Sequence, residues 1–125
     1  MRLLLDTHAM LWALGRSRRL RSSTRAAIAN PRNEVVISSA SVWEASIKIS
    51  TGKLRVPIDL SSALDRAGYL ALDITREHAV AAGALPRHHG DPFDRMLIAQ
   101  AQLEGLTLVT TDRTLAAYDV ALLPA

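Results

Sequence analysis

The sequence predicts an α/β fold in which a mostly parallel sheet carries helices on both faces. Short, uninterrupted apolar runs such as Leu3–Leu5 and Val35–Ser38 have the length and composition of strands that are buried on both faces. Segments of helix length, bounded by capping residues and by glycine or proline, separate these runs. Strands that alternate with helices favour parallel crossovers. At 125 residues, the chain is expected to fold as one domain over residues 1–125.

The N-terminal half is predicted to contain two strands and four helices. These are a strand at Leu3–Leu5, a helix at Thr7–Leu14, a second helix ending at Ala29, a strand at Val35–Ser38, and helices at about 39–50 and 61–68. Ser22 or Ser23 is expected to cap the second helix and Ser39 the third, because serine side chains accept the free amide protons of a first turn. Gly15 and Gly52 are expected to end the first and third helices.

The C-terminal half continues the alternation of strands and helices. The expected elements are a strand at Tyr69–Leu72, a helix from its cap Thr75 to about Leu85, a loop at Pro86–Pro92, a helix at Phe93–Leu103, a strand at Leu106–Thr110, a short helix at Arg113–Tyr118 and a candidate edge strand at Val120–Leu123. Gly105 is expected to stop the long helix that precedes the fourth strand.

Composition restricts the class of protein. Hydrophobic residues make up 49% of the chain and charged residues 22%, which is typical of a globular protein. No apolar run approaches the roughly 20 residues that a membrane span needs, and the N-terminal segment lacks the features of a signal peptide. Cysteine is absent, which excludes disulfides and thiolate metal sites. We therefore expect a cytoplasmic protein without a membrane partner, whose net charge of +3 modestly favours polyanions.

Four acidic residues follow predicted strands or lie at the start of predicted helices: Asp6, Glu44, Asp94 and Asp112. Ligands of an open α/β sheet bind beyond the carboxyl ends of its strands, so carboxylates that arrive there from separate strands would converge. Without a partner they would repel one another and would be costly to desolvate. A hard divalent cation such as Mg²⁺ or Mn²⁺ removes that cost, because it takes oxygen ligands. The pattern therefore predicts a metal-dependent phosphoryl-transfer site.

Each of these acidic residues also has a structural alternative. Asp6 and Asp112 are placed to cap helices, and Glu44 is placed to face solvent near a helix N-terminus, where the helix dipole favours it. Asp91 precedes a proline and is expected to be an N-cap, because proline is favoured at the first helical position. Asp94 then lies in the first turn, where nothing requires a carboxylate. We assign Asp94 as a metal ligand and Asp91 as a cap or a supporting group.

Neighbouring polar residues are candidates to support this site or to contact substrate. Thr7 adjoins Asp6, and either Thr110 or Thr111 is expected to orient Asp112 or to contact a water at the metal. Arg95 is expected to pair with a site carboxylate or with an incoming phosphate.

Histidine and arginine clusters leave two interpretations open. The spacing of His8, His88 and His89 matches no common zinc pattern. His8 is expected to pack or to face solvent, whereas His88 and His89 either contact a phosphate or fill a loop. The densest basic cluster is either a solvated helix end or a contact for a phosphate backbone; it consists of Arg16, Arg18, Arg19 and Arg21.

Four sequence blocks, taken in order, resemble the PIN-domain nucleases and specifically the VapC-type toxins of bacterial toxin–antitoxin pairs. The blocks are Leu4-Leu5-Asp6-Thr7-His8 with Leu11-Trp12, Ser41-Val42-Trp43-Glu44, Asp91-Pro92-Phe93-Asp94-Arg95 with Ile98-Ala99 and Ala101, and Thr110-Thr111-Asp112. Each block alone is a weak signal. The ordered set is specific, and it covers nearly the whole chain.

The resemblance implies a compact, PIN-like α/β/α sandwich and the Mg²⁺- or Mn²⁺-dependent cleavage of RNA by metal-activated water. The ligand positions of the family map onto the four acidic residues named above, and a threonine near the fourth acid, here Thr110 or Thr111, often assists. The resemblance also implies a homodimer that is silenced by a cognate VapB-type antitoxin whose tail occupies the active site. Leu11, Trp12, Val42 and Trp43 are candidates to line the antitoxin groove, with a core role as the alternative.

Two other classes of protein are weaker interpretations of the same pattern. A receiver-like Mg²⁺-binding signalling domain has the same size and class, but it needs adjacent acids after the first strand and a lysine after the last. Here Asp6 is followed by Thr7, and no lysine occurs beyond Lys53. A non-catalytic RNA-binding module with a structural cation is the second alternative, and it predicts metal binding without cleavage.

Overall fold

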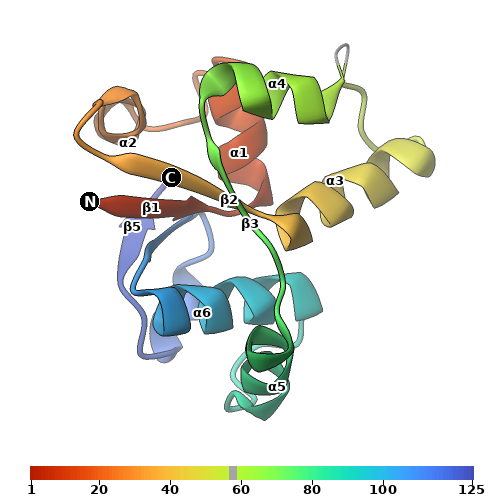
Figure 1. Ribbon diagram of the computed structural model, residues 1–125, viewed down its shortest axis with the longest axis vertical. Helices are drawn as coiled ribbons and strands as arrows, with labels where there is room; N and C mark the ends of the chain where they lie inside the picture. The colour runs from red at the N-terminus through yellow and green to blue at the C-terminus, as the bar shows by residue number, and fades with distance from the viewer. Residues whose placement is uncertain (57–58) are drawn as a thin grey trace.

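The computed structural model describes residues 1–56 and 59–125, which form a five-stranded sheet covered by helices (Figure 1). The strands are β1 (Arg2–Leu5), β2 (Glu34–Ser38), β3 (Leu70–Leu72), β4 (Thr107–Thr110) and β5 (Leu122–Pro124). Their order is β3-β2-β1-β4-β5, and every neighbouring pair is parallel. The predicted α/β class is therefore confirmed. The strand order reverses between β1 and β4, and this switch point is where open α/β sheets bind ligands.

Helices connect these strands and begin and end close to the predicted positions. They are α1 (Thr7–Leu14), α2 (Ser22–Ala29), α3 (Ser39–Ser50), α4 (Leu60–Ala67), α5 (Arg76–Ala84), α6 (Pro92–Glu104) and the 3-10 helix η1 (Arg113–Ala117). Thr75 caps α5 as predicted, since its hydroxyl accepts the amide N–H of His78 at 3.1 Å. Gly105 ends α6 with a φ of 65°, a left-handed conformation that favours glycine. Among the described helices, none has both the length and the apolar character needed to cross a bilayer.

The alternation of side chains along β1 divides the core into two layers. Leu3 and Leu5 pack on one face of the sheet with residues of α1, α2 and α4, including Met10. Leu4 packs on the other face with α6 and η1, including Ile98. Helix α5 packs against α6, and α3 contacts both α1 and α6. These contacts place the start of α3 at the carboxyl edge of the sheet, between the two layers (Figure 1).

Two predicted helix caps were wrong by one residue. The N-cap of α2 is Arg21, whose side chain makes no capping hydrogen bond, so neither Ser22 nor Ser23 has that role. The N-cap of α3 is Ser38 rather than Ser39, because β2 runs directly into the helix and the Ser38 hydroxyl accepts the amide N–H of Ala40 at 3.0 Å. At α3, the adjacent Ser38 and Ser39 offer equivalent capping groups, so the sequence alone does not select between them.

The last strand also lies later in the chain than predicted. It spans Leu122–Pro124 instead of Val120–Leu123, and it forms a parallel edge strand beside β4, with Thr110 opposite Pro124. Proline is tolerated there because an edge strand does not need every amide proton for pairing.

Candidate metal centre

A cleft of about 220 Å³ opens at the carboxyl ends of β1 and β4, at the switch point of the sheet. It is lined by Asp6, Thr7, His8, Glu44, Asp91, Asp94, Thr111 and Asp112. Asp6 follows β1, Glu44 lies on α3, Asp94 lies in the first turn of α6, and Asp112 follows β4. The structure therefore brings the four predicted ligands together from four separate segments.

Asp6 is buried and also caps α1. Its Oδ1 accepts the amide N–H of Ala9 at 2.8 Å. Burial raises the pKa of Asp6, although hydrogen bonds from Ala9, Thr110 and Thr111 and the charge of His8 act in the opposite direction. Burial is the larger effect, so the ionised carboxylate is costly here without a nearby cation. The capping role and a metal-binding role are compatible, because the cap uses one acceptor position of Oδ1 and a carboxylate has about four such positions.

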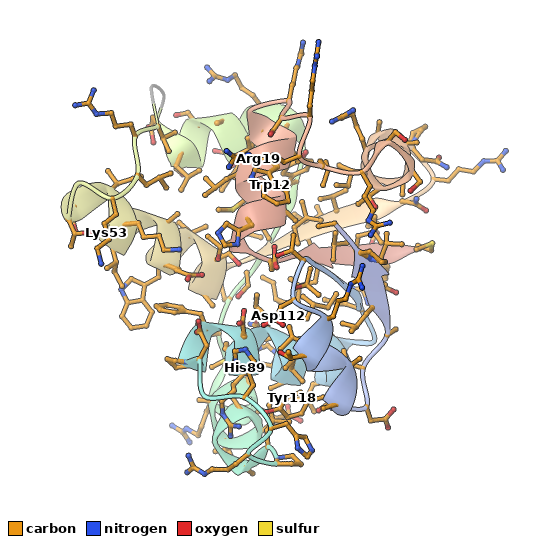
Figure 2. All side chains as sticks on the ribbon, turned by 180° about the vertical axis from the view of Figure 1, so that it is seen from behind. Trp12, Arg19, Lys53, His89, Asp112 and Tyr118 are labelled. Carbon is orange, nitrogen blue, oxygen red and sulfur yellow. The ribbon has the colours of Figure 1, made fainter. Side chains whose placement is uncertain are left out.

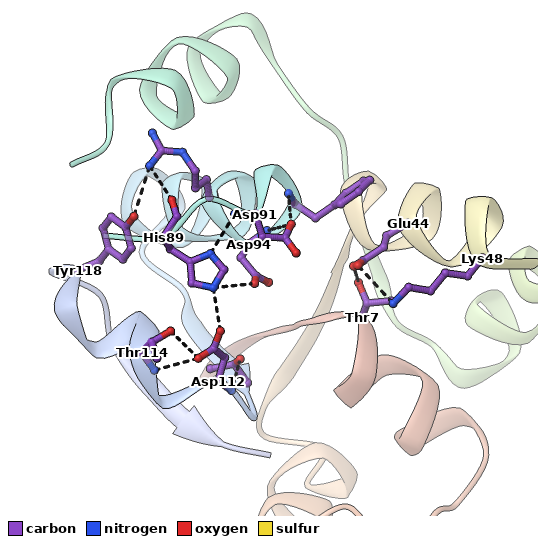
Figure 3. A network of polar contacts seen from close by, with 12 residues as sticks. Thr7, Glu44, Lys48, His89, Asp91, Asp94, Asp112, Thr114 and Tyr118 are labelled. Carbon is purple, nitrogen blue, oxygen red and sulfur yellow. Dashed lines mark hydrogen bonds and ion pairs between the residues drawn. The ribbon is translucent and has the colours of Figure 1, made fainter. Parts of the chain in front are cut away.

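Glu44 is held in the cleft by two neighbours (Figure 3). The Thr7 hydroxyl donates a hydrogen bond to Glu44 Oε1, and Lys48 Nζ lies 3.5 Å from Oε2. The Glu44 side chain is 18% exposed, so it is not the solvent-facing glutamate of the structural alternative. Thr7, predicted to support the site, thus fixes a carboxylate that comes from a different helix.

Asp91 and Asp94 divide their roles along the first turn of α6. Asp91 is the N-cap, as predicted: its Oδ1 accepts the amide N–H of Phe93 at 2.8 Å and that of Asp94 at 3.4 Å. Asp94 makes no such capping contact within the described residues, and its pKa is raised to about 6. Burial is the main cause, and the negative charges of Asp91, Asp6 and Glu44 add to it.

Among the described residues of the cleft, Asp112 is the carboxylate that receives the most side-chain hydrogen bonds. Its Oδ1 accepts hydrogen bonds from Thr114, at 2.9 Å from the amide and 2.6 Å from the hydroxyl. Its Oδ2 lies 2.9 Å from His89 Nε2. The Thr114 hydroxyl is the largest of the effects that hold the pKa of Asp112 below its ordinary value. The amide N–H of Asp112 also donates to Thr110 Oγ1 at 3.1 Å, so Thr110 holds the backbone of Asp112 at the end of β4.

His89 was not assigned to the site from the sequence, yet its side chain lies against two of the four candidate ligands. Its Nε2 contacts Asp112 and lies 3.6 Å from Asp94 Oδ2, while its Nδ1 accepts the amide N–H of Asp91 at 3.1 Å. Figure 2 shows His89 and Asp112 close together, and Figure 3 shows the imidazole between Asp94 and Asp112. The signal in the sequence was the position of His89 two residues before the N-cap of α6, where its ring can accept the cap's own amide proton.

Arg95 does not take the predicted role. Its guanidinium is buried and donates to the carbonyl oxygens of Pro86, Ala82 and Leu85 at 3.0 Å each, and to that of His89 at 3.3 Å. Adjacent helical residues point about 100° apart, so Arg95 faces away from the cleft that Asp94 faces. The expected pairing of Arg95 with a site carboxylate or phosphate is therefore wrong. Arg95 instead anchors the segment that carries His89.

The residues of the cleft fit a hard divalent cation. Asp6, Glu44, Asp94 and Asp112 offer carboxylate oxygens, the ligands that Mg²⁺ and Mn²⁺ prefer. Besides burial, which is the main cause, repulsion from the carboxylates of Asp91, Asp6 and Glu44 raises the pKa of Asp94. A bound cation would remove this repulsion.

A parallel sheet with an acidic cleft at its switch point defines the class: an α/β protein with a candidate ligand site at the carboxyl edge of its sheet. A family model described as the PIN domain matches residues 3–121, and this chain belongs to the PIN domain family. It is similar to ribonuclease VapC22 of Mycobacterium tuberculosis, with 30% identity over 118 residues, which cover 92% of this chain and 90% of the relative.

Solved structures share the fold at lower identity. VapBC2 from Rickettsia felis, bound to a promoter DNA fragment, matches with a TM-score of 0.71 and 19% identity over 98% of both chains. DNA-bound VapBC from Salmonella typhimurium matches with a TM-score of 0.72 and 17% identity, covering 98% of this chain and 97% of that one. At these identities the similarity concerns the fold alone.

The strand order of the sheet, β3-β2-β1-β4-β5, also excludes the receiver-like alternative, because the sheet of a receiver domain has the order 2-1-3-4-5.

Proposed function

We propose that this chain is a metal-dependent endoribonuclease and the toxin of a VapBC-type toxin–antitoxin pair. The observation that carries the proposal is the convergence of four carboxylates on one cleft at the switch point of the sheet. Such a cleft suits phosphodiester chemistry, in which a cation offsets the negative charge of both protein and substrate. Membership of the PIN domain family and the similarity to a ribonuclease support RNA as the substrate.

Asp6, Glu44, Asp94 and Asp112 are the residues that would hold Mg²⁺ or Mn²⁺. When bound, such a cation polarises the phosphodiester and neutralises the charge that develops during displacement. The chain's own contribution is to fix the carboxylates before substrate arrives. Thr7 and Lys48 hold the two oxygens of Glu44, as Thr114 and His89 hold those of Asp112. Groups that are already oriented need no reorganisation during the reaction.

The proposed partner is a VapB-type antitoxin. Among the similar structures are toxin–antitoxin complexes, which supports a partner of this kind. An antitoxin arginine that enters the cleft would pair bidentately with carboxylates and compete with the cation. Trp43 offers apolar surface beside the cleft, since it is 61% exposed and packs edge-on against Phe93 at 5.3 Å.

The other residues suggested for the antitoxin groove are less available. Leu11, Trp12 and Val42 are partly buried and pack against the core.

We further propose that the protein is a homodimer and acts in the cytoplasm, where its RNA substrate would be. Light scattering of the purified protein measures the first of these points directly.

The proposed activity is tested by incubating the purified protein with total RNA, with Mg²⁺, with Mn²⁺ or with chelator, and mapping the cut ends. Attack by water predicts a 5′-phosphate and a 3′-hydroxyl, and Asp94→Asn is expected to abolish cleavage. Asp73→Asn is the matched control, because Asp73 also follows a strand but lies exposed beyond the edge strand β3. RNA binding without cleavage under every metal condition would instead favour the non-catalytic RNA-binding module.

A further inference from the structure

A second hollow, of about 300 Å³, adjoins the carboxylate cleft. The two share Thr111 and Asp112 as lining residues, so they lie side by side at the end of β4. Arg21 and Arg113 line the second hollow, and Leu122 and Pro124 of β5 contribute apolar surface to it. We propose that this hollow, the Arg21–Arg113 pocket, is a subsite for the nucleotide that flanks the scissile phosphate of a single-stranded RNA. The inference rests on the proposed function and extends it to a place on the surface for the substrate.

The charges of the Arg21–Arg113 pocket suit a phosphate. Arg21 and Arg113 are both exposed, and within residues 1–56 and 59–125 neither side chain forms a salt bridge or a hydrogen bond. Other exposed arginines, such as Arg32, also have no side-chain partner among the described residues, but Arg21 and Arg113 are the two that line this hollow. A guanidinium without a partner presents its full fork of donors, which matches the oxygens of a phosphate.

The walls of this pocket are held by the fold. Arg21 is the N-cap of α2, whereas Arg113 opens η1, more than ninety positions later in the chain. The two regions are tied together by the buried Thr24, whose hydroxyl donates to the carbonyl oxygen of Pro124 at 2.5 Å. The amide N–H of Ala125 donates to the Thr110 carbonyl at 3.0 Å and continues this connection to β4. The pocket is therefore bounded by anchored backbone rather than by loose side chains alone.

RNA is the occupant that both neighbouring hollows favour. A strand that places one phosphate at the carboxylate cleft must carry its next phosphate past the rim of that cleft, where the carboxylates repel it. Two uncommitted arginines immediately beyond Asp112 offset that repulsion. The apolar surface of Leu122 and Pro124 beside them can accept the face of a ribose or a base. A free phosphate would use the arginines but not the apolar surface.

The test measures binding apart from cleavage. A fluorescently labelled single-stranded RNA is titrated with Asp94→Asn protein that also carries Arg21→Gln, Arg113→Gln or both changes, at several salt concentrations. Each change is expected to weaken binding roughly fivefold and to lower the slope of log affinity against log salt by about 0.7. Arg32→Gln is the matched control, because Arg32 is exposed in the loop before β2, at the opposite ends of the strands. Thermal unfolding should be the same for all variants.

A second measurement separates the subsite from the proposed activity. In otherwise wild-type protein, Arg21→Gln and Arg113→Gln should each raise KM for an RNA oligonucleotide with little change in kcat. Inorganic phosphate should compete only weakly with RNA for the wild-type protein. If wild-type protein cleaves RNA but both variants bind and cleave like Arg32→Gln, the subsite is refuted and the nuclease stands. If wild-type protein cleaves nothing while RNA binding still depends on both arginines, the subsite stands and the nuclease proposal fails.

Discussion

His89 donates to Asp112 through Nε2, at 2.9 Å from Oδ2, because its Nδ1 is already occupied as an acceptor. The amide N–H of Asp91 points at Nδ1 from 3.1 Å, so the proton of the neutral ring lies on Nε2. Coordination of a metal through Nε2 would require moving that proton to Nδ1, where it would face another N–H group. Although His89, Asp94 and Asp112 together have the spacing of a metal-binding triad, the imidazole is therefore a donor that positions a carboxylate rather than a ligand.

Replacing His89 should weaken metal binding without removing a ligand. We expect His89→Ala to lower Mn²⁺ affinity roughly tenfold, because Asp112 loses one of its orienting hydrogen bonds. His89→Gln, whose amide can still donate, should recover part of the loss. Isothermal titration with Mn²⁺ measures both effects, and pulsed electron paramagnetic resonance of bound Mn²⁺ should show no directly coordinated ring nitrogen.

His88→Ala is the control for this prediction, since His88 packs edge-on against Tyr118 at 5.1 Å and, among the described residues, pairs with none of the four carboxylates, whereas His89 contacts two of them. A coordinated ¹⁴N signal that disappears in His89→Gln would show that His89 is a ligand and would overturn the assignment.

Asp94 and Asp91 should differ sharply when each is changed to asparagine. Asp91→Asn should keep most of the activity and should change the free energy of unfolding by well under about 1 kcal/mol, because asparagine caps a helix as well as aspartate does. Asp94→Asn should abolish cleavage while leaving the metal-free protein at least as stable, because it removes a carboxylate that its neighbours repel. Paired cleavage assays and urea unfolding curves test this, and equal loss of activity in both variants would make Asp91 a ligand as well.

The prediction for Asp91 shows how far the sequence specifies the site. Proline after Asp91 identifies the cap, and apolar runs before Asp6 and Asp112 place those residues at strand ends, so the position of each carboxylate follows from local pattern. Their convergence depends on strand order, which puts β1 beside β4 although about a hundred residues separate them. The periodicity of the sequence predicts the strands but not their order, so the sequence alone does not show which carboxyl ends are neighbours.

Side-chain direction was the part of the site that local pattern did not determine. Arg95 adjoins Asp94 in sequence, yet it points into the loop at 86–91, because successive helical side chains diverge. Conversely, His89 lies in a loop without periodicity, and its position depends on the carbonyl contacts that Arg95 makes. Contacts of this kind come from packing across α5, α6 and their connecting loop.

Arg95 should therefore be important for stability rather than for contact with RNA. Arg95→Lys removes most of the hydrogen bonds to the Ala82, Leu85 and Pro86 carbonyl oxygens and leaves a buried charge with fewer partners. We expect a loss of about 3 kcal/mol in the free energy of unfolding, measured with urea in the presence of chelator. Arg76→Lys, on the exposed start of α5, should be close to neutral. Unchanged stability together with a large rise in KM for RNA would return Arg95 to the substrate role.

The stability of the metal-free protein should depend on pH through Asp94. Its pKa is about 6 in the folded protein and 3.8 in an unperturbed aspartate, so the folded state binds more protons between these values. Stability from this group is therefore present below about pH 4 and is lost as the pH rises through 6. The difference in unfolding free energy between Asp94→Asn and wild type should grow across this window, to at most about 3 kcal/mol. Parallel pH profiles of the two proteins would contradict the assigned environment of Asp94.

Expression of the chain alone should arrest growth of a bacterial host, since a nuclease whose carboxylates are already oriented needs only a cation and RNA to act. Asp94→Asn should be harmless at the same protein level, and Asp73→Asn should remain toxic, because Asp73 lies beyond the edge strand and outside the cleft. Co-expression of the cognate antitoxin should restore growth. The antitoxin is expected to act by placing an arginine among the carboxylates. Changing that arginine to glutamine should then reduce the recovery of growth more than it reduces formation of the toxin–antitoxin complex, because other contacts still hold the complex. Harmless expression of the folded wild-type protein, together with failure to cut RNA in Mn²⁺, would exclude both the toxin and the nuclease.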